Sequence, residues 1–405
     1  MNENGNKTIL MLGGSTQQVT AIRKAKEMGY RTILIDYLPD NPGQFVADRW
    51  YCQSTTDMDA VFNIAKKEKV SGILPYASDP AALPAAIVCE RLGLPTNPAK
   101  SVEILGVKHK FRKFLQDNGF VCPKTFSFNL DTPLKDIING IEGLKFPLVI
   151  KPTDSSGSKG VTFIQDVSEL LQAIDFATLY SRNKVLLAEE YIFRGYPHVI
   201  GGDIFVENGK IIVFGIMECL RDNGGESLIP IGKKRPCGLN ANQIIAVQSE
   251  LQRLISCLDI RNGELNVEVL IDINNQPNFL ELGPRAGGNM IPVQLSDIFG
   301  VDLVRANVAV AMGENVNLKV IEPVECFMTF VLHSHEDGFF AGIEFSPEIE
   351  KNIYRKVIYK KLGDKVEKFD NAGNALGIIF MRFPSKEVMD ITGQNIDRLI
   401  TIKLQ

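Results

Sequence analysis

The sequence predicts an α/β protein that opens with a doubly wound parallel sheet and continues into an α+β part. Strands of buried type alternate with helices over roughly the first hundred residues, which specifies β-α-β units and a parallel sheet. Beyond about residue 118 the chain is rich in strands joined by long polar connections, and a further β-rich segment starts near Val324. A length of 405 residues leaves room for two or three domains.

Three apolar runs of strand length define the N-terminal sheet, and each is followed by a segment of helical periodicity. The expected elements are strands at 8–12, 32–35 and 72–75, a helix that ends at Met28, and helices at 58–68 and 80–92. Asp79 is expected to cap the last of these helices, with Pro80 in its first turn.

Polar residues follow these strands at the edge of the sheet where ligands of such folds usually bind. Gly14 and Ser15 follow the first strand, Asp36 ends the second, and Ser78 follows the third. A nicotinamide-dependent oxidoreductase would need the spacing G-x-G-x-x-G, which is absent from the first loop. These four residues could contact an acceptor substrate, although tight turns and helix caps explain them equally well.

The rest of the chain is predicted as strands interrupted by a few helices. The expected strands are 145–151, 161–165, 185–191, 202–207 and 210–218, and the expected helical segments are 100–118, 170–180, 242–258 and 292–312. The β-rich end carries His333 and His335 on one face of a strand. An H-x-H pair without a third ligand is more often structural than metal-binding, so both histidines are left out of the site.

Composition and charge exclude several classes of protein. A net charge of −4 provides no positive field for a nucleic-acid backbone, so no nucleic-acid partner is expected. The seven cysteines are scattered and never spaced C-x-x-C, which is typical of reduced thiols in the cytoplasm. The polar stretch 1–7 is not a signal peptide, and no apolar run approaches the roughly 20 residues that span a bilayer. We therefore expect a cytoplasmic protein with no membrane partner.

Two carboxylates in neighbouring apolar runs predict a metal site. Alternation places Glu268 on one face of the first run, and Glu281 stands in the second run, beyond a polar turn at 272–278. If the two runs pair as a hairpin, these carboxylates come close together. Oxygen ligands without His or Cys favour Mg²⁺ over Zn²⁺. Arg285 follows at once and could hold a phosphoryl or carboxylate oxygen bidentately.

A lysine followed by a loop of small residues predicts a phosphate site. Lys151 ends the apolar run 146–150, where its ammonium supplies a point charge. Small residues allow backbone N–H groups to close on phosphate oxygens. The Walker spacing is absent, and a flexible Ser/Gly turn is the alternative. The loop residues assigned to phosphate binding are Ser155, Ser156, Gly157, Ser158 and Gly160.

A strand that runs into a loop could bind an adenine ring. Adenine needs an apolar slot and a backbone edge with one donor and one acceptor, which such a junction supplies. The candidate residues are Glu189, Glu190, Tyr191 and Ile192.

Taken in order, these segments resemble the ATP-grasp family, closely from Lys108 to about residue 291 and more loosely over the N-terminal part. In that family a first lysine opens the helix before a G-x-x-x-P segment, as Lys108 does before 119–123. A second lysine in a strand precedes a glycine-rich flap, which matches Lys151 and 155–160. The remaining matches are the adenine hinge at 189–192, the metal carboxylates Glu268 and Glu281, and Arg285 within E-L-G-P-R-A-G-G-N.

The resemblance implies an ATP-grasp fold, in which two α+β subdomains hold ATP between them. The implied boundaries are an N-terminal Rossmann-like domain at 1–105, an ATP-grasp domain at 106–320 with its nucleotide-binding subdomain at about 122–192, and a β-rich C-terminal domain at 321–405.

The resemblance also implies an ATP-dependent ligase that forms an acyl phosphate and releases ADP and phosphate. A small-molecule carboxylate would be activated and then attacked by an amine or a thiol. Lys108 and Lys151 would bind the triphosphate, with Mg²⁺ (or Mn²⁺ in its place) on Glu268 and Glu281. Lys151 and Arg285 would be catalytic, with Arg285 holding the oxyanion of the acyl phosphate. Relatives of this kind are often homodimers.

Two departures from the family pattern leave alternatives open. Gly283 stands where the family usually places Asn, two residues after the second metal carboxylate. The segment 194–198 lacks the acid that binds the ribose. The alternatives are a carboxylating enzyme that uses bicarbonate, of the purine or carbamoyl-phosphate type, and an ATP-binding scaffold without catalysis.

Overall fold

The computed structural model describes residues 7–155, 159–222 and 229–405. The loop residues Ser156, Gly157 and Ser158, which the sequence assigns to phosphate binding, lie outside the described residues. Four sheets organise the described part: a parallel sheet near the N-terminus, a four-stranded and an eight-stranded antiparallel sheet, and a small three-stranded sheet.

The parallel sheet has the strand order β3-β2-β1-β4. Its strands are β1 (Thr8–Leu12), β2 (Arg31–Asp36), β3 (Arg49–Cys52) and β4 (Gly72–Leu74), and its helices are α1 (Val19–Glu27), α2 (Met58–Lys67) and α3 (Asp79–Leu92). Ile9 and Met11 face α1, whereas Leu10 and Leu12 face α2 and α3. Alternate residues of β1 are thus buried on opposite faces, which confirms the doubly wound arrangement.

Two details of this region differ from the prediction. The edge strand β3 was not expected, because Arg49-Trp50-Tyr51-Cys52 is short and is only half-buried. Asp79 is not the N-cap of α3: Ser78 occupies that position and Asp79 is the first helical residue. The carboxylate of Asp79 is therefore available for contacts outside its own helix.

The four-stranded sheet has the order β5-β8-β6-β7 and one helical layer. Its elements are β5 (Thr125–Asn129), α6 (Leu134–Ile141), β6 (Leu148–Pro152), β7 (Thr162–Ile164), α7 (Leu170–Thr178) and β8 (Val185–Glu190). Leu148 and Ile150 pack under α6 and α7. Because successive strand residues point to opposite faces, Lys151 projects from the other side of the sheet.

The eight-stranded sheet forms the centre of the molecule, in the order β13-β12-β9-β10-β11-β14-β18-β16. Its strands are β9 (Ile200–Glu207), β10 (Lys210–Arg221), β11 (Pro230–Arg235), β12 (Gly263–Ile271), β13 (Pro277–Gly283), β14 (Cys326–Leu332), β16 (Ile353–Ile358) and β18 (Gly377–Phe383). Its helices are α4 (Ala99–Gly106), α5 (Lys108–Asp117), α8 (Ala241–Cys257), α9 (Ile291–Phe299) and α10 (Leu303–Ala311). One face packs on α5 and α8, and the other on α9 and α10.

Two predicted helices are each broken in two. The segment 100–118 divides into α4 and α5 at Val107, whose extended backbone (φ −126°, ψ 110°) interrupts the helix. The segment 292–312 divides into α9 and α10 after Gly300, which adopts a left-handed conformation (φ 64°). The first break matters most for function, because it makes Lys108 the first residue of α5 and lets its N–H donate to the Thr153 carbonyl (2.9 Å).

The C-terminal segment contributes three strands to the central sheet and three to a sheet of its own. The small sheet has the order β17-β15-β19. Its strands and the neighbouring helices are β15 (Gly338–Phe345), α11 (Pro347–Glu350), β17 (Lys365–Val366), α12 (Lys386–Gln394), α13 (Ile396–Leu399) and β19 (Ile400–Leu404). Three 3-10 turns complete the described elements: η2 (Pro42–Phe45), η3 (Val167–Glu169) and η4 (Ala372–Asn374).

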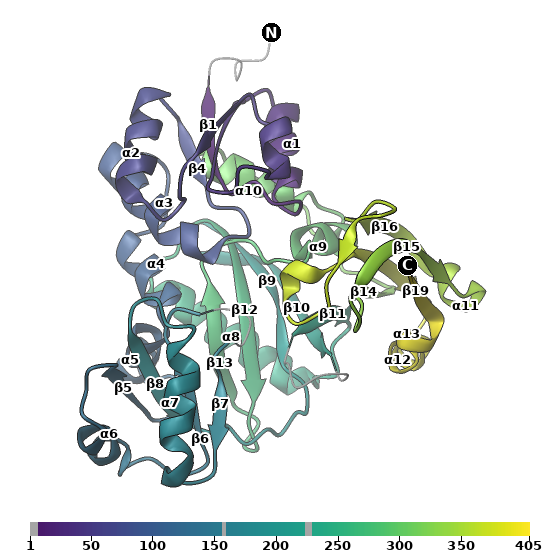
Figure 1. Cartoon of the computed structure of the whole chain (residues 1–405). Helices are drawn as coiled ribbons and strands as arrows, with labels where there is room; N and C mark the ends of the chain where they lie inside the picture. Colours follow the sequence, from purple (N-terminus) through teal and green to yellow (C-terminus); the bar gives the residue numbers. More distant parts are fainter. Residues whose placement is uncertain (1–6, 156–158, 223–228) are drawn as a thin grey trace.

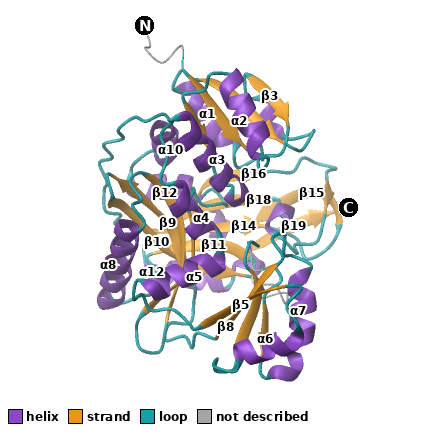
Figure 2. Ribbon diagram, turned by 90° about the vertical axis from the view of Figure 1, so that its left-hand side faces the viewer, coloured by secondary structure: helices purple, strands orange, loops and turns teal. Residues whose placement is uncertain are grey.

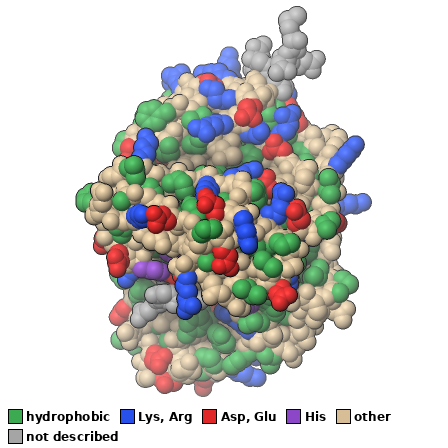
Figure 3. All heavy atoms as spheres, turned by 90° about the vertical axis from the view of Figure 1, so that its right-hand side faces the viewer, with side chains coloured by type: hydrophobic (Ala, Val, Ile, Leu, Met, Phe, Trp, Pro, Cys, Tyr) green, Lys and Arg blue, Asp and Glu red, His purple; other side chains and the backbone are tan. Residues whose placement is uncertain are grey.

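Figure 1 shows the parallel sheet at the top, the four-stranded antiparallel sheet with α6 and α7 at the lower left, and the C-terminal strands at the right. The turned view in Figure 2 places α5 between the central sheet and the β5–β8 sheet. On the face seen in Figure 3, acidic and basic side chains are interspersed, so this face presents no uniformly positive surface. Among the described helices, none combines the length and apolar character needed to cross a bilayer.

Candidate active site

The two predicted metal carboxylates lie side by side in the central sheet. β12 and β13 pair as the expected hairpin, and Glu268 stands directly opposite Glu281. A β-bulge between Glu268 and Val269 locally changes the register. Both side chains are part-exposed, at 28% and 32%. Like charges directly opposite each other destabilise a sheet, so this pair needs cations close by.

Two cationic side chains approach the carboxylate pair. The Arg221 guanidinium, at the end of β10, lies 3.3 Å from an oxygen of Glu268. The Lys108 ammonium lies 3.4 Å from an oxygen of Glu281 and donates to the Ser155 carbonyl at 2.5 Å. The break at Val107 positions Lys108 here, between the hairpin and the loop that follows β6. The structure thus brings together Lys108, Ser155 and the carboxylate pair, four of the residues assigned to the site from the sequence.

Lys151 belongs to a buried ion network. Its ammonium donates to one oxygen of Glu189, and the Nε of Arg112 donates to the other at 2.9 Å. Arg112 is fully buried, and its Nη1 also donates to the carbonyls of Phe279 and Leu280, at 3.1 Å each. A single arginine therefore links β8, which carries Glu189, to β13, which carries Glu281.

This network sets the charges around Lys151. Burial, together with the nearby Arg112 and Lys108, lowers the pKa of Lys151 to about 8 despite the attraction of Glu189. Burial alone would raise the pKa of Glu189, but Arg112 and Lys151 outweigh it and lower that pKa to about 2. Glu189 is thus ionised across the physiological range, whereas Lys151 can lose its proton slightly above neutrality.

The segment predicted to bind adenine joins the two sheets. The N–H groups of Glu190 and Tyr191 donate to Lys124 and Pro147, at 3.0 Å each. The Ile192 side chain packs in an apolar cluster at the edge of the central sheet; the cluster also contains Val199, Cys219, Leu270 and Leu280. Ile192 therefore belongs to a packed apolar cluster, and its N–H donates to none of the described residues. The carboxylate of Glu189 is engaged in the ion network and is not free to bind an adenine ring.

The described ends of the loop after β6 are fixed by local contacts. The Ser155 hydroxyl donates to the Lys159 carbonyl at 2.9 Å. Gly160 adopts φ +73°, and a Cβ there would lie 2.9 Å from the Pro152 ring. Glycine is therefore required at 160 by both conformation and space.

Arg285 is held in place by Asp79 of the N-terminal domain. Its Nε donates to one oxygen of Asp79 at 2.7 Å and its Nη2 to the other at 2.5 Å. Its Nη1 donates to the Ala286 carbonyl at 3.0 Å. These bonds occupy one edge of the guanidinium and orient the plane of the group.

Gly283 lies against this pair. A Cβ at 283 would approach an Asp79 oxygen to 3.0 Å and the Arg285 Cζ to 3.2 Å. A larger side chain would therefore displace Asp79 or Arg285. The departure from the family pattern at 283 has a steric cause: the carboxylate of Asp79 occupies the space that the side chain of an asparagine would need.

A second acidic pair lies buried next to this region. Asp203 accepts from Asn266 at 2.7 Å and from the Gly287 N–H at 2.6 Å. Burial and the proximity of Asp203 raise the pKa of Glu264 well above its usual range, and burial also raises that of Asp203. Glu264 also accepts from Asn307. Both carboxyl groups therefore hold their protons to a higher pH than exposed carboxyl groups do.

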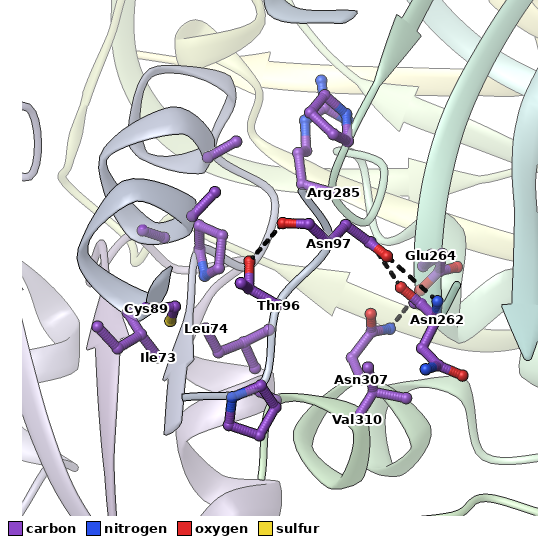
Figure 4. A pocket seen from close by; sticks show the side chains of 18 of the residues that line it. Ile73, Leu74, Cys89, Thr96, Asn97, Asn262, Glu264, Arg285, Asn307 and Val310 are labelled. Carbon is purple, nitrogen blue, oxygen red and sulfur yellow. Dashed lines mark hydrogen bonds between the residues drawn. The ribbon is translucent and has the colours of Figure 1, made fainter. Parts of the chain in front are cut away.

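Glu264 lines a cavity of about 190 Å³ between the N-terminal domain and the central sheet. Figure 4 shows the side chain of Asn97 spanning the cavity wall toward Asn262, with Glu264 and Asn307 beside them. The amide of Asn97 donates to the Asn262 carbonyl at 2.7 Å, which ties the two parts of the molecule together.

The loops at the edge of the parallel sheet face the same region. The Gln17 side chain accepts from the Asn289 N–H at 2.6 Å, so the loop after β1 contacts the chain that follows Arg285. Asp36 accepts from the N–H groups of Gly14 (2.6 Å) and Leu38 (2.8 Å) and so stabilises its own turns. Ser15 is exposed and Ser78 is half-buried.

Three residues in contact with the predicted site were not anticipated from the sequence: Arg112, Asp79 and Arg221. Arg112 follows Phe111 and precedes Leu115 on the apolar side of α5, and a charge among buried positions is the signal that could have revealed it. Asp79 gave no such signal, because a helix start fully explains an acidic residue next to a proline.

The sequence of this chain is similar to one protein family and to two kinds of characterised enzyme. The sequence family described as Carbamoyl-phosphate synthase L chain, ATP binding domain, matches residues 108–319. The carbamoyl phosphate synthase large chain of Thermotoga maritima is 23% identical over 297 residues, which cover 72% of this chain and 26% of that protein. The chain thus spans about a quarter of the length of those synthases. The formate-dependent phosphoribosylglycinamide formyltransferase of Wolinella succinogenes is 26% identical over 279 residues, 68% of this chain and 69% of that one.

Solved structures share the fold over nearly the whole chain. An L-amino acid ligase from Bacillus licheniformis superposes with a TM-score of 0.81 at 21% identity, covering 99% of both chains. A phosphoribosylglycinamide synthetase from Anaerococcus prevotii gives 0.79 at 19% identity and covers 98% of this chain and 100% of its own. An N5-carboxyaminoimidazole synthetase from Staphylococcus aureus, solved with ADP, gives 0.74 at 18% identity over 98% of both chains.

Proposed function

This chain belongs to the ATP-grasp family, and we propose that it is an ATP-dependent ligase that joins a carboxylate to an amine, or to a thiol, through an acyl phosphate. One observation carries the proposal. Glu268 and Glu281 stand opposite each other in the β12–β13 hairpin, and Lys108 lies 3.4 Å from Glu281. This cluster of part-exposed charges has no evident structural purpose, whereas a metal–triphosphate complex requires such a cluster.

The donor set of the carboxylate pair fits Mg²⁺. Two carboxylates supply hard oxygen ligands, and the remaining positions of an octahedral ion suit water and phosphate oxygens. Mn²⁺ fits the same ligands. Bound there, the ion would neutralise charge on the β- and γ-phosphates. Arg221 would orient Glu268 through its contact at 3.3 Å.

The residues of the chain supply positioning and charge, which phosphoryl transfer needs more than a covalent nucleophile. Lys108 and Lys151 would bind the phosphates from two sides. Ser155 and Gly160, the described ends of the loop after β6, would lie beside these phosphates. The adenine ring would lie against the apolar cluster that contains Ile192, with the Ile192 N–H as its hydrogen-bond donor.

Arg285 would bind the carboxylate substrate. A carboxylate oxygen attacks the γ-phosphorus, the bond to the β–γ bridging oxygen breaks, and ADP leaves with an acyl phosphate formed. The amine then attacks the carbonyl carbon, and inorganic phosphate leaves. Asp79 holds the Nε/Nη2 edge of Arg285 and the Ala286 carbonyl accepts from Nη1, so the oxyanion would be bound by the N–H groups of Nη1 and Nη2 that remain.

A carboxylating enzyme that uses bicarbonate is the second candidate. The match to the carbamoyl-phosphate synthase ATP-binding domain favours it. The fold shared with the N5-carboxyaminoimidazole synthetase from S. aureus is also consistent with it. The third candidate, a scaffold without catalysis, rested on Gly283. A side chain at position 283 would collide with Asp79, and this collision explains why glycine stands there. The glycine is therefore no argument for a loss of catalysis.

The proposal includes the cellular location and the oligomeric state of the protein. We place the protein in the cytoplasm, because all seven cysteines are free thiols and ATP is the phosphoryl donor. A homodimer is proposed by analogy with a biotin carboxylase domain from Hydrogenobacter thermophilus, which is described as a dimer.

The test is a substrate screen with purified protein, Mg²⁺ and ATP. Pools of amino acids and small carboxylates, each with and without bicarbonate, are assayed for ADP and phosphate, and the products are identified by mass spectrometry. The proposal expects ADP release that depends on one pool and a condensed amide or thioester of matching mass. ADP release that requires bicarbonate alone would support the carboxylating enzyme instead.

A further inference from the structure

Two strand ends of the central sheet bring a carboxylate and two imidazoles together. β10 and β14 each pair antiparallel with β11, so they run in the same direction and end at the same edge. Asp222 follows β10, and His333 and His335 follow β14. One ligand atom from each of the three side chains lies within 4.8 Å of the others. The oxygen of Asp222 and the Nε2 of His335 are 3.9 Å apart.

The ring of His333 is held in the orientation typical of a metal ligand. Its Nδ1 lies 2.7 Å from the Val331 carbonyl. Because a carbonyl can only accept, Nδ1 carries the proton and Nε2 keeps its lone pair. Histidines that bind metals commonly donate their other N–H to a backbone carbonyl in this way. The ring stacks on Phe369 (centroids 4.5 Å apart, 28° between planes), which prevents it from turning freely.

We propose that Asp222, His333 and His335 form a binding site for a divalent transition metal, with Zn²⁺ as the expected occupant, separate from the Mg²⁺ site. Two imidazole nitrogens and one carboxylate oxygen are a common ligand set for Zn²⁺ with a fourth, open position. The H-x-H pair lacked a third ligand in the sequence, and the fold supplies Asp222, which follows β10 and lies more than a hundred residues earlier in the chain.

The geometry needs only a small adjustment to close on an ion. Metal–ligand bonds of about 2.0–2.2 Å place neighbouring ligands of a tetrahedral ion roughly 3.4 Å apart. The His335 side chain is 48% exposed, so it can move toward Asp222 without disturbing the core. Asp222 and His333 are buried and supply the fixed part of the site.

The site would act on the proposed active site through one residue. Asp222 directly follows Arg221, whose guanidinium contacts Glu268. An ion on Asp222 would fix the end of β10 to the end of β14 and so restrict the position of Arg221. This coupling rests on the proposed function, whereas metal binding does not depend on it.

Zinc titration of the whole chain tests the proposal. Bound metal is first removed from the protein with a chelator. The protein is then titrated with Zn²⁺ by calorimetry in excess Mg²⁺, which is added to fill the proposed site at Glu268 and Glu281. We expect one Zn²⁺ per chain and a Co²⁺ absorption spectrum typical of tetrahedral coordination. His335→Ala should weaken zinc binding by roughly tenfold or more, and Asp222→Asn should do the same.

His198 provides a matched control. Its side chain is 50% exposed, and its Nε2 lies 3.7 Å from the buried Glu218, as His335 lies near Asp222. His198→Ala should bind Zn²⁺ like the wild-type protein. The proposal is overturned if the wild-type protein binds no Zn²⁺, or if the His335→Ala and Asp222→Asn proteins, folded by circular dichroism, bind it with unchanged affinity. A failure of ligase activity would leave both of these binding measurements intact.

Discussion

Asp79 and Arg285, 206 residues apart in the sequence, are joined by two parallel N–H···O bonds of 2.7 and 2.5 Å. The pair connects the first turn of α3 in the parallel sheet domain to the chain just beyond β13. Arg285 is therefore positioned by Asp79 of α3 as well as by the chain that follows β13. The arrangement gives the N-terminal domain a direct role in the proposed chemistry, in addition to any contact with an acceptor substrate.

Restoring the family's asparagine should impair the protein, because the new side chain collides with this pair. We expect Gly283→Asn to lower kcat/KM by at least about tenfold, since Arg285 loses its orientation. The check is a double-mutant cycle with Asp79→Ala, which removes the colliding carboxylate. Asp79→Ala should lower kcat/KM much less in the Gly283→Asn protein than in the wild-type protein. Strictly additive effects would show that residues 79 and 283 do not interact.

Binding of ATP should depend on pH through Lys151. With a pKa of about 8, this lysine is partly neutral in slightly alkaline solution, and a bound triphosphate would draw a proton onto it. The affinity for ATP should therefore fall as pH rises above 8, by up to about tenfold per pH unit. Calorimetry in buffers of different ionisation enthalpy would detect the proton uptake.

Lys151→Arg is the control for this titration, because arginine stays charged at every pH used. The variant should show no proton uptake on binding ATP. If it takes up as many protons as the wild-type protein, another group is responsible for the pH dependence.

Arg112 should be essential to the stability of the fold. Replacing it with methionine leaves the buried Glu189 with Lys151 alone, and the loss of one partner of a buried ion pair costs about 3–5 kcal/mol. Chemical denaturation should show a decrease of that order in the free energy of unfolding. Arg261 pairs with Asp259 at 3.1 Å but is 69% exposed, so Arg261→Met should change stability little. Similar effects of the two substitutions would contradict the assignment.

The Glu264–Asp203 pair should make the protein less stable as pH rises. A carboxyl whose pKa is raised on folding contributes stability that is fully present below its unfolded value and is lost as pH rises through its folded value. The raised pKa of Glu264 thus predicts that the protein loses stability as pH rises from about 4.5 upward. Glu264→Gln keeps the shape and the hydrogen bonds without the charge.

The Glu264→Gln protein should melt at a higher temperature than the wild-type protein at pH 8, with a smaller difference at about pH 5.5. The comparison needs only thermal melts at the two pH values. A variant that is less stable at pH 8 would mean that Glu264 is ionised there and stabilises the fold.

Local patterns in the sequence were enough to predict much of this molecule. Alternation in two apolar runs predicted that Glu268 and Glu281 meet, because register in a hairpin follows from side-chain direction. The doubly wound sheet followed from strands buried on both faces. β3, β5 and β11 were missed, since each is short and mixes polar with apolar residues, as Pro230–Arg235 illustrates.

Contacts between distant segments could not be predicted from one sequence. Nothing near Asp79 indicates that it meets Arg285, and nothing near His333 indicates Asp222. The break between α4 and α5 at Val107 was missed although Gly106 directly precedes it, because a single glycine inside a helical pattern is often tolerated and does not by itself end a helix. The burial of Arg112 contradicts the usual exposure of charged residues, and only the tertiary structure supplies its partner Glu189.

The transfer of an oxygen atom from the carboxylate substrate to phosphate tests the central claim most directly. Once the screen has identified the acid, it is labelled with ¹⁸O in the carboxylate and turned over with ATP, Mg²⁺ and the acceptor. An acyl-phosphate ligase must deliver one ¹⁸O to each phosphate released with ADP, and Glu281→Gln should abolish the turnover. Unlabelled phosphate, release of AMP and pyrophosphate, or full activity without Glu281 would contradict the account.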